Sequence, residues 1–209
     1  MKKILFITAL AFGCYSANAQ KKTSPVNFGL KGGLNVSNLT TNGSGFDYQF
    51  KPSFHAGGLL HIHLGDKYHR FALQPELLFS RQGASFNDIT NTKYNVALNY
   101  IAVPVLFQYM FGNGFRLETG PQVSAMLDAQ RMGAGKTVNV SSSFKPVDFS
   151  WVFGGGYVWK SGFGLDARIN AGLSDINNVP PSNTTVRNLV FAVGAFYIFN
   201  NERHMHKSQ

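Results

Sequence analysis

The chain has 209 residues, which suits a single domain, and a formal net charge of +9 at pH 7. Charged residues make up only 14% of it and aromatic residues another 14%, with 22 glycines and 19 phenylalanines. This composition is odd for the surface of a water-soluble domain. The basic residues are scattered along the chain, which argues against a nucleic-acid partner.

The first 19 residues have the pattern of a secretory signal peptide that is removed on export. Lys2 and Lys3 form a basic start, residues 4–12 an apolar run, and Ala17-Asn18-Ala19 a cleavage site. The run is too short for a membrane-spanning helix, which needs about 20 residues. Lipid attachment at Cys14 is the alternative, but residues 11–13 match a lipobox poorly. Since Cys14 is the only cysteine, the mature chain is expected to have no disulfide and no cysteine-bound metal.

After a polar leader at residues 20–25, the chain alternates between apolar and polar residues in eight long segments. Strict alternation is typical of strands with two different faces. In the first segment Phe28, Leu30 and Leu34 lie on one face, while Lys31 and Asn35 lie on the other. The eight expected strands are 26–39, 50–64, 70–82, 98–111, 115–127, 146–159, 163–174 and 187–199, followed by a polar tail at 200–209.

The clearest alternation lies in the hairpin at residues 98–127. Its arms meet at a turn of residues 112–114, Gly-Asn-Gly, a sequence that tolerates positive φ. One face is apolar throughout, and the other carries Arg116, Glu118, Gln122 and Asp128. Each arm exceeds ten residues, whereas strands of soluble proteins usually have about five or six. The pattern predicts a transmembrane β-barrel with lipid on the apolar face and a polar lumen.

The connections between the expected strands alternate in length. Long ones are expected at 40–49, 83–93, 129–145 and 175–186, and short ones at 65–69, 112–114 and 160–162. Long extracellular loops and short periplasmic turns are typical of bacterial barrels with an even number of strands. Both termini are therefore expected in the periplasm. Aromatic residues gather near both ends of the strands, which indicates two aromatic girdles.

The soluble alternative is a lipocalin-like barrel or a sandwich with its apolar face turned inward. A small barrel with every Phe, Trp and Leu inside would be overfilled, and a soluble exterior would carry more Lys and Glu. We therefore interpret the chain as an all-β protein, an eight-stranded antiparallel transmembrane β-barrel over residues 26–199 in the cell outer membrane.

Five segments in order resemble the PorT-like outer-membrane β-barrel family of Gram-negative bacteria. They are FGLKGGLNVSNL, LQPELLFSRQG, YIAVPVLFQYMF, FRLETGPQVSAML and LDARINAGLSDI, spread over nearly all of the mature chain. The resemblance implies the fold and the location. It also implies that Gly194, Tyr197 and Phe199 are similar to the carboxy-terminal signal read by the barrel assembly machinery, although Ala192 stands where that signal prefers a polar residue.

The lumen face carries a candidate charge network. An eight-stranded barrel has an interior just wide enough for side chains, so we expect these charges to pair and plug it, with a narrow pore for small solutes as the alternative. The members are Lys31, Glu76, Arg116, Glu118, Asp166 and Arg168.

His61 and His63 lie two apart on one strand face and are weak candidates for a metal site, since His-x-His can bind zinc or copper. Hydrogen-bonded lumen histidines are the simpler interpretation. The loops show no paired His and acidic residues for catalysis, and no glycine-rich phosphate loop is present. We expect no enzyme activity, no cofactor and no metal. The expected function is a structural or binding role, with outer-membrane lipid around the barrel and a protein or ligand partner at the extracellular loops.

Overall fold

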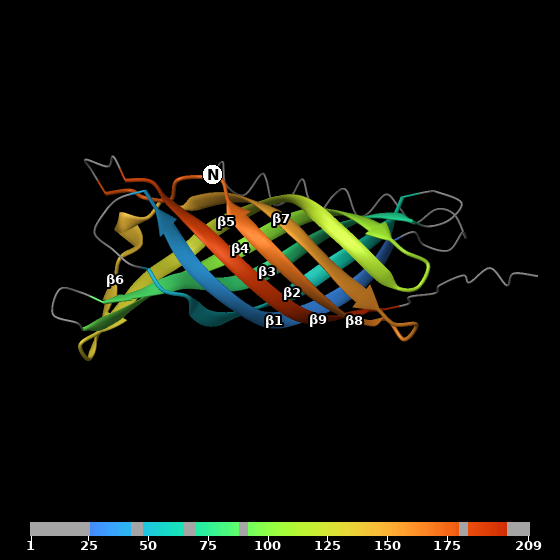
Figure 1. Cartoon of the computed structure of the whole chain (residues 1–209), viewed down its shortest axis with the longest axis horizontal. Helices are drawn as coiled ribbons and strands as arrows, with labels where there is room; N and C mark the ends of the chain where they lie inside the picture. Colours follow the sequence, from blue (N-terminus) through green and yellow to red (C-terminus); the bar gives the residue numbers. More distant parts are fainter. Residues whose placement is uncertain (1–25, 43–47, 65–69, 88–91, 180–183, 200–209) are drawn as a thin grey trace, which may run out of the picture.

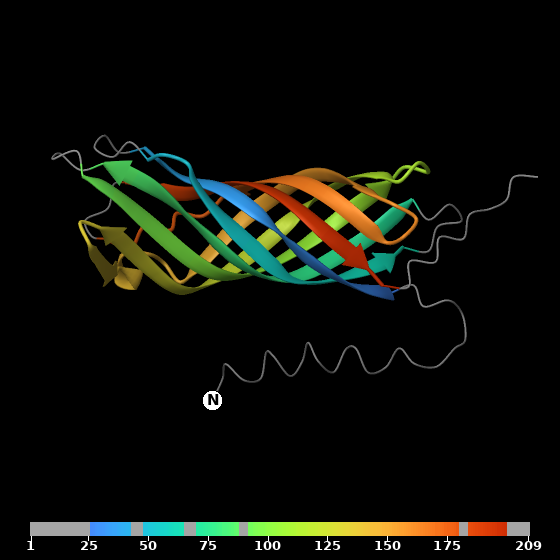
Figure 2. The same ribbon diagram turned by 90° about the horizontal axis from the view of Figure 1, so that it is seen from below.

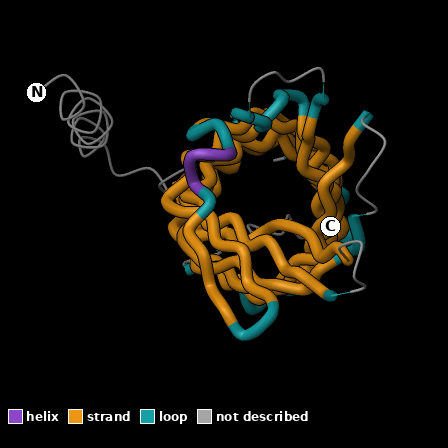
Figure 3. Tube along the Cα trace, turned by 90° about the vertical axis from the view of Figure 1, so that its left-hand side faces the viewer, coloured by secondary structure: helices purple, strands orange, loops and turns teal. Residues whose placement is uncertain are grey.

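The computed structural model of the chain describes residues 26–42, 48–64, 70–87, 92–179 and 184–199. Within them one antiparallel sheet runs in the order β4-β3-β2-β1-β9-β8-β7-β5-β6, and β4 also pairs with β5. Eight strands therefore close into a ring, visible in Figures 1 and 2 and end-on in Figure 3. The strands are β1 (Val26–Thr41), β2 (Lys51–His63), β3 (Phe71–Asn87), β4 (Lys93–Met110), β5 (Phe115–Gly133), β6 (Lys136–Asn139), β7 (Val147–Val158), β8 (Phe163–Gly172) and β9 (Val186–Ile198). The predicted eight-stranded antiparallel barrel is confirmed.

The two ends of the barrel differ. At one end, the turn end, the tight turns at 111–114 and 159–162 join neighbouring strands, and β1 begins and β9 ends there. The other end, the loop end, carries the long connections from β5 to β7 and from β8 to β9, with the short strand β6 and a turn of 3-10 helix, Ser141–Ser143. The connection from β3 to β4 at this end was predicted to be long, but only residues 88–92 separate the two strands. Both ends of the barrel chain thus lie at the turn end.

The apolar face of every barrel strand points away from the ring. Leu34, Leu77 and Val193 are 69%, 60% and 63% exposed, while Lys31 and Glu76 on the other face are almost fully buried. Such a continuous apolar exterior is far larger than the patches that soluble monomers expose. It suits contact with lipid and rules out the inside-out arrangement of a lipocalin-like protein. No helix within the described residues is long and apolar enough to span a membrane.

Aromatic rings form a belt near each end of the apolar surface. At the turn end, Tyr109 and Phe111 lie 4.9 Å apart between ring centroids, and Tyr157 and Trp159 lie 5.1 Å apart. At the loop end, Phe54 contacts Phe79 and Phe50 contacts Phe191, both with centroids 5.8 Å apart. Aromatic side chains prefer the boundary between hydrocarbon and water, so the belts mark the two edges of the membrane-facing surface.

Two features at the loop end differ from the sequence-based expectation. The strands β3, β4 and β5 continue through residues that were expected to be loops, and β6 forms a hairpin with β5. The strands persist because their inward residues Ala84, Val96 and Ala129 pack into an apolar cluster. Tertiary packing here outweighs a local composition rich in Gly, Ser and Asn.

A β-bulge in β5 changes which residues face the lumen. Asn99 pairs with Asp128 and Tyr100 with Met126, so Leu127 has no partner in β4. The extra residue shifts the alternation by one position, and Ala129 becomes the buried residue. The prediction that Asp128 faces the lumen was therefore wrong. Asp128 accepts a hydrogen bond from Asn99 Nδ2 at 2.9 Å instead.

Candidate functional site

The six predicted charged residues all face the interior of the ring, where none is more than 6% exposed. They are placed by four strands, and three are basic and three acidic. Lys31 lies on β1, Glu76 on β3, Arg116 and Glu118 on β5, and Asp166 and Arg168 on β8. Equal numbers of opposite charges allow the group to be neutral in total, which lowers the cost of burying it.

Arg168 is the centre of this group. Its Nη1 and Nη2 donate to the two carboxylate oxygens of Glu76 at 2.7 and 2.8 Å, and its Nε donates to Glu118 Oε1 at 2.5 Å. Its Nη2 also lies 3.3 Å from Asp166 Oδ2. Since three strands separate β8 from β3 in either direction round the ring, the bidentate pair with Glu76 joins opposite walls of the barrel. The ion pairs therefore cross the lumen.

Lys31 adds a second cation at the edge of the group. Its Nζ donates to Asp166 Oδ2, and both side chains are almost wholly buried. Asp166 thus lies between Lys31 and Arg168, and the pairs form one connected chain from β1 through β8 to β3 and β5. Charge-assisted, bidentate contacts of this kind fix side-chain positions more firmly than neutral hydrogen bonds.

Arg116 lies apart from this chain of ion pairs. Its Nη1 donates to Gln74 Oε1 at 3.3 Å, and its guanidinium carbon lies 4.1 Å from the centroid of the Phe196 ring. No carboxylate among the described residues lies within ion-pair distance of it. The six residues therefore do not pair as one set: five form the ion-pair chain, and Arg116 stacks on an aromatic ring beside it.

Two glutamines bridge the charges. Gln74 Nε2 donates to Glu76 Oε1 at 2.7 Å, and Gln108 Nε2 donates to Glu118 Oε2 at 2.8 Å. Gln74 Oε1 also lies 3.3 Å from His61 Nδ1. The sequence placed these glutamines on the lumen face but gave no sign of their role. The available signals were that Gln74 lies two residues before Glu76 on the same strand face, and that Gln108 lies opposite Glu118 in the predicted hairpin.

The two candidate metal ligands lie side by side at the turn end. The rings of His61 and His63 are 4.7 Å apart between centroids and nearly perpendicular, and His61 is buried against Gln74. In the described part of the chain, no group of three or more His, Cys, Asp or Glu side chains is arranged to hold a metal ion.

Glycines on the lumen face leave room for the ion pairs. A Cβ on Gly194 would lie 3.0 Å from Asp166 Oδ1 and 3.1 Å from Lys31 Cε, and one on Gly154 would lie 2.8 Å from Arg168 Cγ. Gly194 therefore has a packing role, whatever its place in the predicted assembly signal. The other members of that signal, Tyr197 and Phe199, point outward into the turn-end aromatic belt, with ring centroids 5.1 Å apart.

Apolar clusters lie in the lumen on both sides of the charges. The turn-end cluster consists of Leu59, Val158, Phe196 and Ile198. The larger loop-end cluster consists of Leu39, Ala84, Val96, Leu98, Tyr100, Ala129, Ile176 and Val186. The buried lumen side chains thus form three layers, apolar, charged and apolar, with polar side chains such as Asn35 and Asn188 between the charges and the loop end.

The connections at the loop end are tied together into a cap. Lys145 Nζ donates to Asp175 Oδ2 at 2.8 Å, and the backbone N–H of Val186 donates to Asp175 Oδ1 at 2.9 Å. Burial on its own would raise the pKa of the Asp175 carboxyl, but these hydrogen bonds outweigh it and hold the pKa below its usual value. Ile176, the residue after Asp175, is fully buried and packs into the loop-end cluster. The cap joins the β5–β7 and β8–β9 connections at the loop end.

Comparison with known proteins agrees with this architecture. The family described as outer membrane protein beta-barrel domain matches residues 18–178. No curated protein matches the chain. Ail, the attachment invasion locus protein of Yersinia pestis, has a similar fold with a TM-score of 0.50 and 13% identity, covering 83% of this chain and 98% of Ail. Neisserial surface protein A gives a TM-score of 0.54 and 12% identity, covering 81% of this chain and 96% of that one.

Proposed function

The chain belongs to the family of outer membrane proteins with a β-barrel domain, and we propose that it is a closed, non-enzymatic barrel whose loop end binds a partner. The observation that carries this proposal is the filled lumen. Ion pairs from Arg168 to Glu76 join opposite walls, and apolar clusters lie on both sides of them. With the interior occupied, the parts of the protein left to make contacts are the lipid-facing wall and the two ends.

A narrow porin is the alternative. Conduction through this barrel would require a path past Arg168, its three carboxylate partners and both apolar clusters. Separating buried ion pairs is costly, because each charge would be left without its partner in a medium of low dielectric constant. The contents of the lumen therefore favour the closed barrel over the porin.

The loop end has the properties of a binding platform. The hairpin of β5 and β6 extends it, and Val138 and Val179 are 45% and 51% exposed there. Asn178 ties the two halves of the cap, since its backbone N–H donates to Ser143 O at 3.0 Å and its Nδ2 to Ser142 O at 2.9 Å. A surface held in one conformation loses little entropy on binding, so exposed apolar side chains on it suit a protein partner.

We also propose the branch of the family, the role of the segments outside the barrel and the orientation of the barrel in the membrane. The five segments that resemble the PorT-like branch lie within the described residues and support membership of that branch. The signal peptide at residues 1–19, the leader at 20–25 and the periplasmic tail at 200–209 lie outside the described residues and stay predictions. The turn end, where β1 begins and β9 ends, faces the periplasm in this proposal, and the loop end faces outward. The barrel assembly machinery would then read Gly194 and Tyr197 on β9 and Phe199 directly after it, before the ring closes.

Cysteine labelling in intact cells tests the orientation. Removal of the signal peptide leaves no cysteine, so Val138→Cys at the loop end and Asn113→Cys in the tight turn each introduce a single thiol. A membrane-impermeant maleimide should label the first variant in intact cells and the second only after permeabilisation. The reverse pattern would overturn the proposed orientation.

Site-specific crosslinking tests partner binding. A photoreactive benzophenone amino acid at Val138 or Val179 should yield protein adducts in living cells. The same group at Phe107, 44% exposed on the lipid-facing wall, is the matched control and should yield lipid adducts alone. Absence of protein adducts from both loop-end positions would refute the binding platform.

A further inference from the structure

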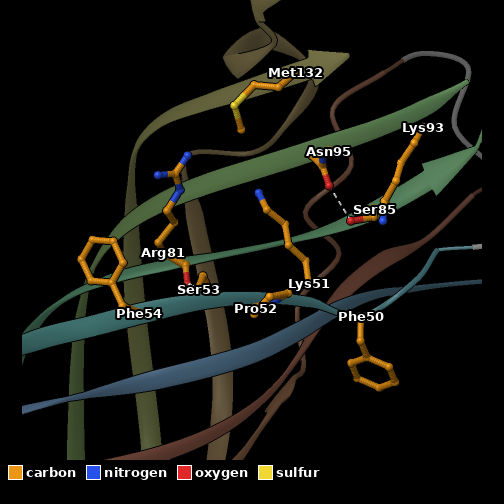
Figure 4. Close-up of a pocket in the computed structure, with 10 residues that line it drawn as sticks. All are labelled: Phe50, Lys51, Pro52, Ser53, Phe54, Arg81, Ser85, Lys93, Asn95 and Met132. Carbon is orange, nitrogen blue, oxygen red and sulfur yellow. Dashed lines mark hydrogen bonds between the residues drawn. The ribbon is translucent and has the colours of Figure 1, made fainter. Parts of the chain in front are cut away.

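A hollow of about 450 Å³ lies in the barrel wall near the loop end, where β2 separates from β3. From His55 to His63, β2 pairs with β3, but residues Lys51 to Phe54 pair with β1 alone. Beyond this gap the isolated bridge between Gln49 and Ser85 brings the two segments together again. Figure 4 shows the residues that line the hollow: Phe50, Lys51, Pro52, Ser53, Phe54, Arg81, Ser85, Lys93, Asn95 and Met132.

Among the described residues, the lining carries three basic side chains and no acidic one. Lys51 and Arg81 point the same way from neighbouring strands, toward β5, and Lys93 lies beside Ser85 (Figure 4). Of the described carboxylates, none forms an ion pair with any of the three. The Nε of Arg81 is buried without a hydrogen-bond partner. Buried polar groups normally have partners, so the hollow favours an added anion.

Gly83 explains why the hollow has this shape. Its φ of +130° favours glycine, and a Cβ there would lie 2.2 Å from the backbone oxygen of Val96. Lys51 Nζ donates to that same oxygen at 2.9 Å. The missing side chain therefore leaves space for Lys51 to cross from β2 to β4 and bring its charge into the hollow.

Apolar side chains flank the hollow where it meets the membrane-facing wall. Phe50 and Phe54 are 51% and 46% exposed, and both belong to the loop-end aromatic belt through their contacts with Phe191 and Phe79. Aromatic belts lie at the level of lipid headgroups. The three cations thus lie where an anionic headgroup meets the edge of the hydrocarbon.

We propose that this hollow binds the phosphate group of a membrane lipid, with the acyl chains of the lipid lying along Phe50 and Phe54. The guanidinium of Arg81 supplies the planar pair of donors that suits phosphate, and the ammonium groups of Lys51 and Lys93 supply further charge. A free phosphate ion would satisfy the cations but would leave the exposed aromatic rings without a contact. The combination of charge and apolar surface therefore fits a lipid.

Met132 makes the site measurable, because its side chain lines the hollow while Met110 lies at the turn end. The barrel, labelled at its methionine methyl groups and folded in dodecyl maltoside, is titrated with short-chain dihexanoyl phosphatidic acid and followed by NMR. Dihexanoylglycerol, which lacks the phosphate, and inorganic phosphate, which lacks the chains, are titrated in parallel. We expect a saturable shift of the Met132 methyl with phosphatidic acid, none with dihexanoylglycerol, and no shift of Met110.

Three variants identify the groups that bind. Arg81→Gln should weaken phosphatidic acid binding by about tenfold and the exposed Lys93→Gln by about threefold, whereas Arg187→Gln, another loop-end cation on β9, should leave it within about twofold. Because Lys93 is the exposed first residue of its strand, its variant should fold even if Arg81→Gln does not. Inorganic phosphate binding as tightly as phosphatidic acid would overturn the lipid assignment. Equal shifts with dihexanoylglycerol, or equal losses from Arg187→Gln and Lys93→Gln, would overturn the phosphate site itself.

Discussion

Replacing Arg168 with methionine should destabilise the folded barrel by about 3–5 kcal/mol, the usual cost of removing one partner from a buried ion pair. The Arg168 side chain is only 4% exposed, and its partners Glu76, Glu118 and Asp166 are fully buried. The change removes a bidentate pair and a third contact at 2.5 Å. It leaves three carboxylates facing the remaining cations, of which Lys31 alone forms an ion pair.

Equilibrium unfolding in denaturant, with the barrel folded in detergent micelles and followed by tryptophan fluorescence and gel mobility, measures this loss. Two control variants, one at an arginine and one at a lysine, set the scale for the loss of stability. Arg116→Met removes one hydrogen bond of 3.3 Å and a ring contact, and should cost about 1–2 kcal/mol. Lys145→Met removes a pair whose side chains are 44% and 29% exposed, and should cost about 0–1 kcal/mol because solvent screens it.

A second substitution tests whether the loss comes from unpaired charge. Adding Glu76→Gln to Arg168→Met removes one of the carboxylates left without an ion-pair partner and leaves two basic and two acidic residues of the original six. The double variant should therefore recover part of the stability, with a coupling free energy of about 1.5–3 kcal/mol. If Arg168→Met cost no more than Lys145→Met, or if the two substitutions were simply additive, the ion-pair account of the lumen would be refuted.

Three further predictions concern the wall, the lumen glycines and the cap. Phe107→Arg should cost about 2–4 kcal/mol in the same unfolding assay, because Phe107 lies on the lipid-facing wall, whereas Phe107→Leu should be close to neutral. Gly194→Ala should cost about 1–3 kcal/mol by displacing the pair of Lys31 and Asp166, while Gly112→Ala, with open space around it, should change little. Ile176→Ala should cost about 2–4 kcal/mol and expose the cap to limited proteolysis, unlike Val179→Ala at the exposed surface; equal cleavage of the two variants would argue against the cap.

The alternation of side chains was enough to predict the barrel and which face meets lipid. Residues such as Phe107 and Leu117 are exposed on the wall, and Gln108 and Glu118 are buried in the lumen, as the period of two required. The alternation predicted the wrong face where a β-bulge adds one residue to β5. No feature of the sequence marks the bulge at Leu127, so the face of Asp128 was assigned wrongly.

The candidate site could be predicted as a set of residues but not as a set of contacts. The sequence placed Arg116 and Arg168 on the same lumen face, yet only the positions of β3 and β8 across the ring decide that Arg168 reaches Glu76. The hollow beside Arg81 was not predicted at all. It depends on where β2 stops pairing with β3, and strand pairing is a property of the closed sheet rather than of any one segment.

Single-channel recording of the folded wild-type barrel in a planar lipid bilayer tests the central claim, that the lumen is closed, most directly. Gel mobility without heating should first establish that the inserted protein is folded. A lumen crossed by the Arg168 ion pairs and filled at both ends should give no stable open state, because eight strands leave room for side chains but not for a column of water. Large, stable single-channel currents from the wild-type protein would contradict the closed barrel and favour the porin.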